Sequence, residues 1–371
     1  TFYHRELLKT FNSIDAVIRG DGEVPFAKYA DTLINNNQSL ASVPNLTYRN
    51  DKNYIKENSL TYVAESLDHL NFTNTELLKN AKTYIGKSRK LMGIPYNLSV
   101  GRGCPFNCPL CGGGQRAQFK ISKRKKVILR SPENVVEDIK TIKNKYDVNS
   151  FFFGHGTYGS NLQYWRTLFN LIQEEQLDIS ADLEIWRLPF PRDMWIHFAK
   201  TFNRKHSSIS ISPRTTSKRV QKRIAKICDP TFSFPLDQIY SLIENANLVQ
   251  RELRIWLSVG FPLQKYQDIM KDFYFTIKSL LKYGPSLVKP ITIMNEPYYI
   301  FPGSPAYECP KDFGVTLNHN SILEIVNSFK QSKISFFYNV INYETEKFPG
   351  PMIQNLNKLL FLCAAPMFLT S

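Results

Sequence analysis

The chain has 371 residues, 43% of them hydrophobic, and a formal net charge of +15 at pH 7. This length suffices for one large domain or two ordinary ones with a buried core. No apolar run reaches the roughly 18–20 residues that cross a bilayer, and the first residues do not resemble a signal peptide. We therefore expect a cytoplasmic protein without a membrane span.

The N-terminal region predicts part of an α/β unit. Residues 6–11 have helical character, residues 16–19 read as a short buried strand, and residues 26–34 as an amphipathic helix. Residues 36–95 form a mostly polar connector with a small hairpin near residues 43–51. The N-terminal unit by itself lacks the strands that would complete a sheet.

From Asn97 onward, strands alternate with helices, which is typical of a parallel sheet with crossover helices. The six candidate strands are 97–100, 150–153, 179–186, 207–211, 255–259 and 288–294, and helical sequence follows the first five, as at 132–146 and 264–281. The pattern predicts an α/β fold, a partial (β/α)6 barrel, whose chemistry takes place at the C-terminal strand ends.

These observations divide the chain into four predicted parts. They are an N-terminal α/β unit at 1–35, a connector at 36–95, the barrel at 96–315 and a C-terminal extension at 316–371. The sequence indicates no role for the extension.

A dense basic segment runs from Lys120 to Arg130. Such a segment can attract nucleic acid, an acidic peptide or an anionic cofactor, or it can be a solvated loop in a lysine-rich chain. No aromatic-studded RNA-binding signature accompanies it. We therefore do not expect nucleic acid as the partner.

Three of the six cysteines, Cys104, Cys108 and Cys111, follow the first barrel strand with the spacing C-x3-C-x2-C. Three thiolates on one loop can hold three corners of a 4Fe–4S cubane and leave the fourth iron open. A structural zinc site would need a fourth ligand, and the nearest histidine, His155, lies a helix and a strand away. The spacing favours the cluster, and zinc is the alternative.

This spacing, at the end of the first strand of a (β/α) repeat, resembles that of the radical SAM superfamily. The resemblance implies that the three cysteines ligate a 4Fe–4S cluster whose free iron binds S-adenosylmethionine. One electron from the cluster then yields a 5′-deoxyadenosyl radical, so the resemblance also implies an electron donor such as flavodoxin or ferredoxin. The substrate, a small molecule or a peptide, is not indicated. Leu110 stands where the family usually has an aromatic residue.

Further segments agree with the family in order and placement. The resemblance implies contacts to the cofactor from Gly112 and Gly113 on the loop, Gly154, His155 and Gly156 at the second strand, Ser212 and Arg214 at the fourth, and Gly260 and Pro262 at the fifth. The acidic residues usual at the second strand and the Glu-Ser pair usual at the fourth are absent. The sequence therefore leaves those contacts undecided, and the alternative role of His155 is that of a surface or packing residue.

The segment from Asp15 to Glu23, followed by Pro25 and Phe26, resembles the last strand and helix of a cobalamin-binding domain. The resemblance implies that residues 1–35 are the C-terminal remnant of such a doubly wound α/β domain. Residues 301–307 resemble a stretch that follows the sixth strand in cobalamin-linked members. The resemblance implies a cobalamin-dependent protein that performs methyl transfer or a rearrangement. The family's Asp-x-His-x-x-Gly loop is absent from these residues. We expect a piece of a longer enzyme, the alternative being a relative without the cofactor domain.

Two other classes remain open. A zinc-stabilised nucleic-acid-binding protein would use the cysteines structurally and the basic segment on phosphates. A non-catalytic relative would keep the barrel without turnover. The four tryptophans, Trp165, Trp186, Trp195 and Trp256, are expected in the core rather than around a substrate.

Overall fold

The computed structural model describes residues 2–35, 39–81, 83, 85, 93–202, 206–283, 291–296, 298–319, 321–331 and 341–364. The chain forms two compact units, each made of several segments. Unit 1 comprises Thr1–Glu65, Gly103–Val127 and Pro297–Gln354, and unit 2 comprises Ser66–Arg102, Ile128–Glu296 and Asn355–Ser371. The four-part division expected from the sequence stays a prediction.

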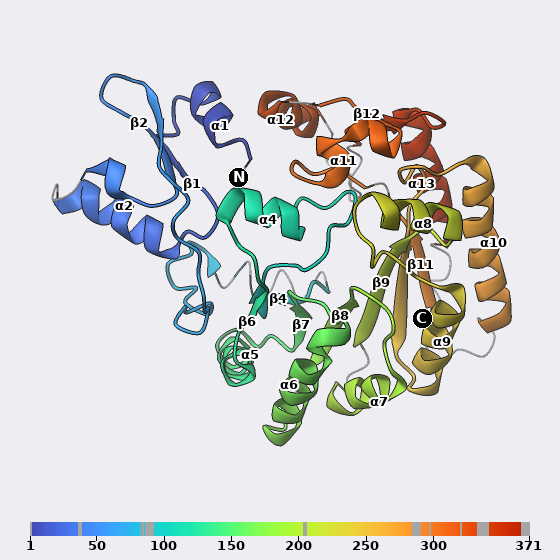
Figure 1. The fold of residues 1–371 in the computed structure, drawn as a ribbon. Coiled ribbons are helices and arrows are strands. Elements are labelled where there is room, and N and C mark those ends of the chain that lie inside the picture. Colours follow the sequence, from blue (N-terminus) through green and yellow to red (C-terminus); the bar gives the residue numbers. More distant parts are fainter. Residues whose placement is uncertain are drawn as a thin grey trace. The chain divides into compact units, whose positions relative to one another are not determined.

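Unit 2 is built on a six-stranded parallel sheet (Figure 1). Its strands are β4 (Tyr96–Leu98), β7 (Ser150–Phe153), β8 (Ser180–Ile185), β9 (Ser208–Arg214), β10 (Glu252–Leu257) and β11 (Ile291–Asn295). The spatial order β11-β10-β9-β8-β7-β4 follows the chain order. Each crossover therefore places a strand beside its predecessor, as in a segment of a (β/α) barrel. Within the described residues, β4 and β11 are not paired with each other and the sheet is open.

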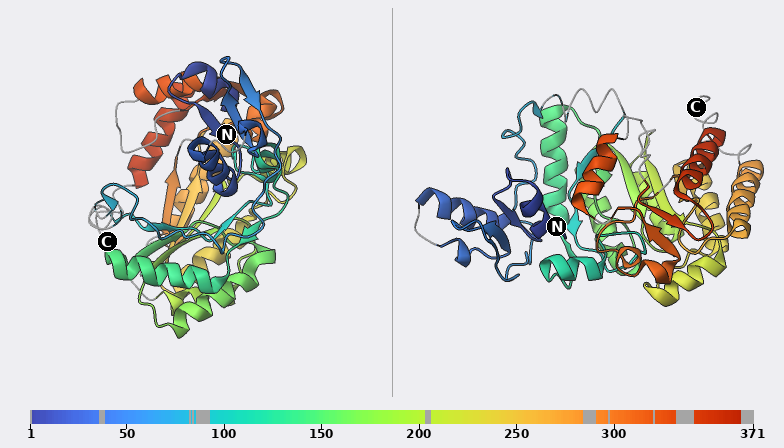
Figure 2. Two further views of the ribbon diagram at one scale, coloured as in Figure 1. Left: turned by 90° about the vertical axis from the view of Figure 1, so that its left-hand side faces the viewer. Right: turned by 90° about the horizontal axis from the view of Figure 1, so that it is seen from above.

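Helices cover one face of this sheet. They are α5 (Pro132–Tyr146), α6 (Leu162–Glu174), α7 (Arg192–Thr201), α8 (Lys218–Ile227), α9 (Leu236–Leu248) and α10 (Tyr266–Tyr283). In Figure 1, α5, α6, α7, α9 and α10 lie along the same side of the strands, and Figure 2 shows this layer from two other directions. The sequence sets the bounds of α5: the helix begins with Pro132 in its first turn and ends at Asp147, which caps its C-terminus in the left-handed conformation.

Burial alternates along the strands and distinguishes the two faces of the sheet. Apolar side chains such as Leu183, Ile209 and Ile255 point toward the helices and are at most 1% exposed. The residues between them are half-buried and many are polar, among them Glu184 and Arg254. We call these two sides the helix-covered face and the open face.

The open face carries a charge network rather than a hydrophobic layer. The Arg254 guanidinium donates to Glu252 at 2.9 Å and to Asp182 at 3.3 Å. Burial opposes the charge on Arg254, but hydrogen bonds from the side chain to these carboxylates raise its pKa. The bond to Asp182 therefore links β10 to β8 through side chains on this face.

The core of unit 2 lies between the sheet and the helices. Trp165 and Trp195 are 0% exposed, and Trp165 meets Phe153 and Phe169 with ring centroids 5.7 and 6.0 Å apart. Trp186 and Trp256 are only half-buried. The expectation that all four tryptophans are core residues is therefore wrong for two of them, because these two follow the polar alternation of the strands.

Unit 1 begins with a three-stranded antiparallel sheet in the order β1 (Ala16–Ile18), β2 (Leu46–Arg49), β3 (Ile55–Glu57). β2 is the partner of the N-terminal strand β1, and its hairpin with β3 extends to Glu57, beyond the predicted range of 43–51. Helices α1 (His4–Thr10) and α2 (Glu23–Asn35) accompany the sheet, and Val43, Leu46 and Tyr48 form a small buried cluster with Ile18 and Tyr29.

The remaining elements are short. They are β5 (Gly101–Arg102) paired with β6 (Ile128–Leu129), α4 (Gln115–Ser122), α11 (Pro305–Glu308), β12 (Val315–Leu317) paired with β13 (Tyr343–Thr345), α12 (Ile322–Gln331), α13 (Gly350–Ala364), and the 3-10 turns η1 (Leu40–Ser42), η3 (Gly159–Asn161) and η5 (Pro310–Phe313).

The predicted strands agree with the structure to different degrees. The strand at 150–153 and the helix at 132–146 are observed over the same residues. The fourth strand extends to Arg214, and the fifth begins at Glu252, three residues before its predicted start. The predicted start of the sixth strand, Val288, lies outside the described residues, and β11 begins at Ile291. Among the described residues, none of the helices is both long and apolar enough to cross a membrane.

Candidate functional site

Cys104, Cys108 and Cys111 stand on one loop of unit 1 and are all half-buried. The Cys111 N–H donates to the Cys108 carbonyl at 3.2 Å, which closes a turn between two of the sulfur-bearing residues. The Gly113 N–H donates to Cys111 Sγ at 3.3 Å. A backbone N–H directed at sulfur favours the thiolate, and such hydrogen bonds tune iron–sulfur clusters.

The loop is fixed by backbone bonds to the segment before α11 and to α11 itself. Phe301 N–H donates to the Leu110 carbonyl at 3.1 Å, and Ala306 N–H donates to the Pro109 carbonyl at 3.0 Å. Leu110 itself is 3% exposed. At the position where the family usually has an aromatic residue, this chain therefore has a buried aliphatic one, next to the backbone bonds that hold the loop.

The first helix after the cysteines is also bonded to the loop. Gln115 N–H donates to the Phe106 carbonyl at 2.8 Å, and Arg116 N–H to Asn107 Oδ1 at 2.9 Å. The Gln118 side chain donates to the Gly113 carbonyl at 2.6 Å. α4 and the cysteine loop are thus tied together by hydrogen bonds from its first turns.

The three glycines after Cys111 have different surroundings. A Cβ atom on Gly112 would lie 2.5 Å from the Pro302 carbonyl oxygen, and one on Gly114 would lie 2.8 Å from that of Phe106. A Cβ on Gly113 would meet only Cys111 Sγ, at 3.6 Å. Neighbouring backbone atoms therefore leave no room for a side chain at Gly112 and Gly114. At Gly113 there is open space beside the sulfur of Cys111.

This donor set fits an iron–sulfur cluster. The loop presents three thiol groups, a backbone N–H directed at one sulfur, and an open position at Gly113. Within the described part of the chain, no three His, Cys, Asp or Glu side chains converge on a point where one ion would bind. A cubane does not require such convergence, since each cysteine binds a different iron.

The remaining candidate residues lie in unit 2, after β7, β9 and β10. His155 is 2% exposed, its Nδ1 lies 3.2 Å from the Gly156 carbonyl oxygen, and its ring centroid is 4.3 Å from that of Trp186. A Cβ on Gly156 would lie 2.3 Å from the Trp186 ring, and one on Gly154 would lie 3.0 Å from the Leu98 carbonyl oxygen. The structure thus places His155 and Gly156 against Trp186, and Gly154 against the neighbouring strand.

Ser212 and Arg214 end β9. Arg214 has a φ of +63°, in the left-handed region that few non-glycine residues adopt. Its guanidinium donates to Glu296 at 2.7 Å, and its carbonyl accepts from the Ser258 N–H at 2.8 Å. Backbone strain of this kind is concentrated at functional sites, and here it directs an arginine–carboxylate pair to the end of the sheet.

Gly260 and Pro262 form the turn after β10. Gly260 has a φ of +80°, which glycine adopts without steric cost. Val259, the residue before Gly260, is held by the side chain of Asn357 in α13. The Asn357 Nδ2 donates to the Val259 carbonyl at 3.0 Å, and the Asn357 Oδ1 accepts from the Val259 N–H at 3.1 Å. Gly260 and Pro262 are themselves buried.

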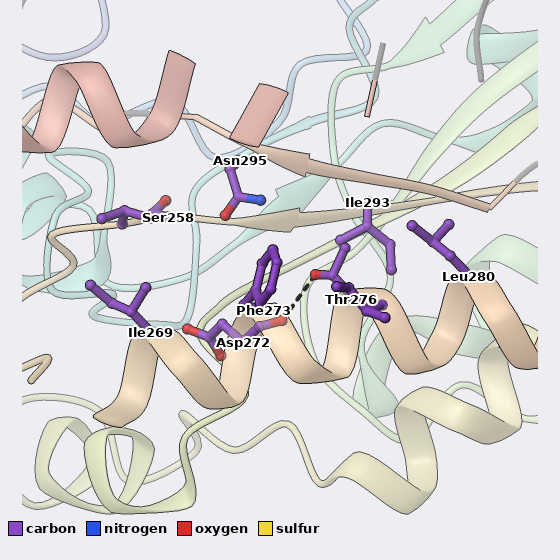
Figure 3. A pocket seen from close by; sticks show the side chains of 10 residues that line it. Ser258, Ile269, Asp272, Phe273, Thr276, Leu280, Ile293 and Asn295 are labelled. Carbon is purple, nitrogen blue, oxygen red and sulfur yellow. Dashed lines mark hydrogen bonds between the residues drawn. The ribbon is translucent and has the colours of Figure 1, made fainter. Parts of the chain in front are cut away.

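A cavity of about 240 Å³ lies between α10 and the ends of β10 and β11 (Figure 3). Ile269, Phe273 and Ile293 contribute apolar walls, with Ser258 and Asn295 on the strand side (Figure 3). The Ser258 hydroxyl is buried and has no hydrogen-bond partner among the described residues. The cavity thus contains a polar group that the surrounding protein does not satisfy.

Asp272 of α10 lines the same cavity. Burial raises the pKa of Asp272 to about 6, against the opposing effect of hydrogen bonds donated by Thr216 and Thr215. The Gln264 side chain also donates to it, at 3.0 Å. This carboxyl group therefore joins the turn after β10 to the loop after β9.

Sequence reasoning missed several residues at the strand ends, above all Glu184 and Trp186. The Trp186 indole donates to Glu184 Oε2 at 3.0 Å, and its ring stacks on Tyr158 with an interplanar angle of 4°. The strict alternation in β8, with Leu183 and Ile185 in the core, is the signal that could have found Glu184 and Trp186. Glu296 offered no comparable signal, because its partner Arg214 lies far away in the sequence.

Comparisons with known proteins give a family for the barrel segment. Residues 98–270 match the model of the Radical SAM superfamily. A curated relative, the uncharacterized methyltransferase PH0819 of Pyrococcus horikoshii, is 26% identical over 48% of this chain and 36% of its own length. The anaerobic magnesium-protoporphyrin IX monomethyl ester cyclase of Rubrivivax gelatinosus is 26% identical over 41% of this chain and 26% of its own. The chain thus spans about a third or less of these relatives.

Solved structures share the fold. The radical S-adenosylmethionine methyltransferase TsrM from Kitasatospora setae, solved with its tryptophan substrate and a SAM analogue, superposes with a TM-score of 0.62 at 11% identity. This covers 85% of the chain and 58% of TsrM. The cobalamin-dependent S-adenosylmethionine radical enzyme OxsB superposes with a TM-score of 0.57 at 16% identity, over 78% of the chain and 39% of OxsB.

The family match covers the cysteine loop, the last residue of β4 and the strands β7, β8, β9 and β10, and the fold agrees with it over most of the chain. The match implies a 4Fe–4S cluster and S-adenosylmethionine as the cofactors. The segment of residues 98–270, which includes the cysteine loop, is therefore similar to the radical SAM superfamily.

Proposed function

We propose that this chain is the catalytic part of a radical SAM enzyme, with Cys104, Cys108 and Cys111 as the ligands of its 4Fe–4S cluster. The observation that carries the proposal is the cysteine loop, with its hydrogen bond from Gly113 N–H to Cys111 Sγ and the open space at Gly113. The cluster, when bound, supplies one electron for the reductive cleavage of S-adenosylmethionine to methionine and a 5′-deoxyadenosyl radical.

The chain's own residues bind and orient in this proposal. The three thiolates hold the cluster, and the backbone bonds from Phe301 and Ala306 keep their loop in place. Gly113 lets the ligand of the fourth iron approach the sulfur-bearing loop. Gly154, His155, Gly156, Ser212, Arg214, Gly260 and Pro262 are the proposed cofactor contacts from unit 2, with Gly112 the further candidate on the loop.

We further propose methyl transfer linked to cobalamin as the reaction of the whole protein, with a rearrangement at an unactivated carbon as the second candidate. The support is the fold shared with TsrM and OxsB and the relatedness to a protein described as a methyltransferase. The relatedness to a cyclase supports the second candidate. The substrate is proposed to be a small molecule.

For cobalamin itself, this chain offers little of a binding site. The Asp-x-His-x-x-Gly sequence that would supply a cobalt ligand is absent. Asp21, in the segment that resembles a cobalamin domain, is 5% exposed and instead pairs with Arg124 and accepts from the Ala64 N–H at 2.9 Å. We therefore expect this chain alone to bind cobalamin poorly. A stoichiometric cobalt spectrum from these residues would contradict that.

The central test is anaerobic reconstitution with iron and sulfide, followed by dithionite and S-adenosylmethionine. We expect about four irons per chain and formation of 5′-deoxyadenosine, measured by chromatography. Cys108→Ala should abolish the product and most of the iron. Cys309→Ala is the matched control, because Cys309 is an exposed cysteine of the same unit outside the loop.

The same experiment separates the alternatives. Zinc without iron in the purified protein, together with tight and salt-dependent RNA binding, would favour the zinc-stabilised nucleic-acid-binding protein. A fully loaded cluster that forms no 5′-deoxyadenosine would favour the non-catalytic relative.

A further inference from the structure

The basic segment after the cysteine loop has a structure that the proposed function does not explain. Residues 115–127 contain six Lys and Arg residues and no Asp or Glu. Two of the six have structural partners: Arg124 is 4% exposed and pairs with Asp21, and Lys120 pairs with Glu308. The interpretation of the basic segment as a solvated loop is therefore wrong at Arg124. The buried pair anchors the segment at its middle.

The lysines on either side of that anchor are exposed. Lys123, Lys125 and Lys126 all face solvent, as does Arg116 at the start of α4. The ion pairs of residues 115–127 in the described part of the chain involve none of these four. Their positive charges are therefore available to a partner.

An aromatic ring lies among these charges. Phe119 is 42% exposed, with Lys123 Nζ 5.0 Å and Lys125 Nζ 6.0 Å from its ring centroid. Exposed aromatic side chains surrounded by charged residues are frequent anchors of protein interfaces. We call the set Arg116, Phe119, Lys123, Lys125 and Lys126 the α4 basic surface.

This surface adjoins the first cysteine. Lys125, Lys126 and Arg124 line a small hollow whose other walls include Cys104, Gln115 and Gln118. The backbone at Val127 passes close to Gly103: a Cβ atom added to Gly103 would lie 3.0 Å from the Val127 Cα. The lysines and a proposed cluster ligand therefore share one wall of unit 1, held together by the bonds that fix α4 to the loop.

We propose that the α4 basic surface is the docking site of an acidic protein that carries one electron on a flavin or an iron–sulfur centre. The inference rests on the proposed function, which consumes one electron per cleavage. Electron transfer slows steeply with distance, so the carrier must bind beside the cluster loop. The electron passes from the reduced carrier, which is oxidised, to the cluster, which is reduced, and no bond is formed or broken at the interface.

Charge complementarity identifies the partner. An unneutralised positive patch attracts a negatively charged surface and accelerates its association by about 10- to 1,000-fold at low ionic strength. A nucleic acid would meet the same lysines, but its recognition uses several stacking aromatic residues along a groove. The α4 basic surface contains a single aromatic residue, Phe119, and lies beside a cysteine sulfur, which favours the electron carrier.

The test uses Lys125→Glu/Lys126→Glu and a matched control, Lys271→Glu/Lys278→Glu, which changes the same charge on exposed positions of α10. Binding of an acidic flavodoxin to the cluster-free protein is measured at about 50 mM salt. We expect the Kd to rise at least about tenfold in the first variant and to stay within about twofold in the control. The dependence of log Kd on log salt should also become flatter in the first variant.

Activity supplies the second readout. With the reconstituted enzyme, chemically reduced flavodoxin should drive 5′-deoxyadenosine formation at least about tenfold more slowly in Lys125→Glu/Lys126→Glu than in the wild type. Dithionite, a small reductant that needs no docking surface, should give equal rates in both. If the wild type forms no 5′-deoxyadenosine with dithionite, the proposed function is wrong. The docking site is then tested by the binding measurement alone.

Three results would overturn the docking site. They are an unchanged Kd for flavodoxin in the first variant, an equal loss in the α10 control, or RNA binding that is tight in the wild type and lost in the first variant while flavodoxin binding is kept.

Discussion

The cysteine loop of unit 1 and the parallel sheet of unit 2 are held in place by different means. Three half-buried cysteines stand on a loop that backbone hydrogen bonds fix to residues 301–306 and to α4. The sheet is held by fully buried side chains such as Trp165, Trp195 and Phe153. The difference teaches that the residues proposed to hold the cluster contribute little to the core. Metal loading and folding stability should therefore respond to different substitutions.

The largest effect on stability is expected from the core of the sheet. Trp165→Ala removes a ring that is 0% exposed and contacts Phe153 and Phe169. It should lower the free energy of unfolding by about 3–5 kcal/mol, measured by urea denaturation of the cluster-free protein. Iron per folded chain should be unchanged. Trp256→Ala, at a half-buried position on the open face, is the control and should cost less than half as much. Equal losses would contradict the distinction between the two faces.

A second prediction concerns the pH dependence of stability that Asp272 causes. The pKa of Asp272 is about 6 in the folded protein, against 3.8 for a free side chain. The folded state thus binds more protons than the unfolded state between these values. The stabilisation is fully present below pH 3.8 and is lost as the pH rises through about 6. It amounts to about 3 kcal/mol, since one pKa unit corresponds to about 1.4 kcal/mol.

Urea denaturation of the wild type and Asp272→Asn at several pH values between 4 and 7.5 measures this change. In Asp272→Asn, the free energy of unfolding should not show this part of the decrease with rising pH. Asp268→Asn is the control, because the pKa of Asp268 is shifted in the opposite direction. Burial raises the pKa of Asp268, but hydrogen bonds from Arg219 and Ser217 outweigh burial and lower it. An identical pH dependence of the wild type and Asp272→Asn would contradict the prediction.

The smallest effect is expected in the loop itself. Gly112→Ala brings a methyl group to within 2.5 Å of the Pro302 carbonyl oxygen. It should displace the loop at a local cost of about 1–3 kcal/mol and reduce the iron bound on reconstitution. Gly113→Ala, whose added methyl group meets only Cys111 Sγ at 3.6 Å, should bind iron like the wild type. If Gly113→Ala were the worse of the two for iron content, the structural account of these glycines would be wrong.

Local patterns made much of the fold predictable. The helix Pro132–Tyr146 begins with a proline in its first turn and has a clear apolar stripe, and the strand Ser150–Phe153 is short and aromatic. The start of β10 was missed because Glu252 and Arg254 read as polar loop residues. They are strand residues whose charges are satisfied on the open face, by each other and by Asp182.

The site was predictable where its spacing is local and not where its partners are distant. The C-x3-C-x2-C spacing lies within eight residues and indicated the cysteine loop directly. The close approach of Pro302 to Gly112 and the burial of Arg124 against Asp21 join residues far apart in the sequence. No single-sequence pattern reports such contacts, so the sequence does not distinguish a glycine required by its neighbours from one with open space beside it.

The four tryptophans give this protein a built-in optical reporter. Trp165 and Trp195 are shielded from solvent, whereas Trp186 and Trp256 are half-buried. An aqueous quencher such as iodide should therefore reach only the second pair, and should separate the emission into two components. Because Trp186 touches the ring of His155 and bonds to Glu184, a molecule that settles at the end of β7 or β8 would change the accessible component and leave the shielded one as an internal reference.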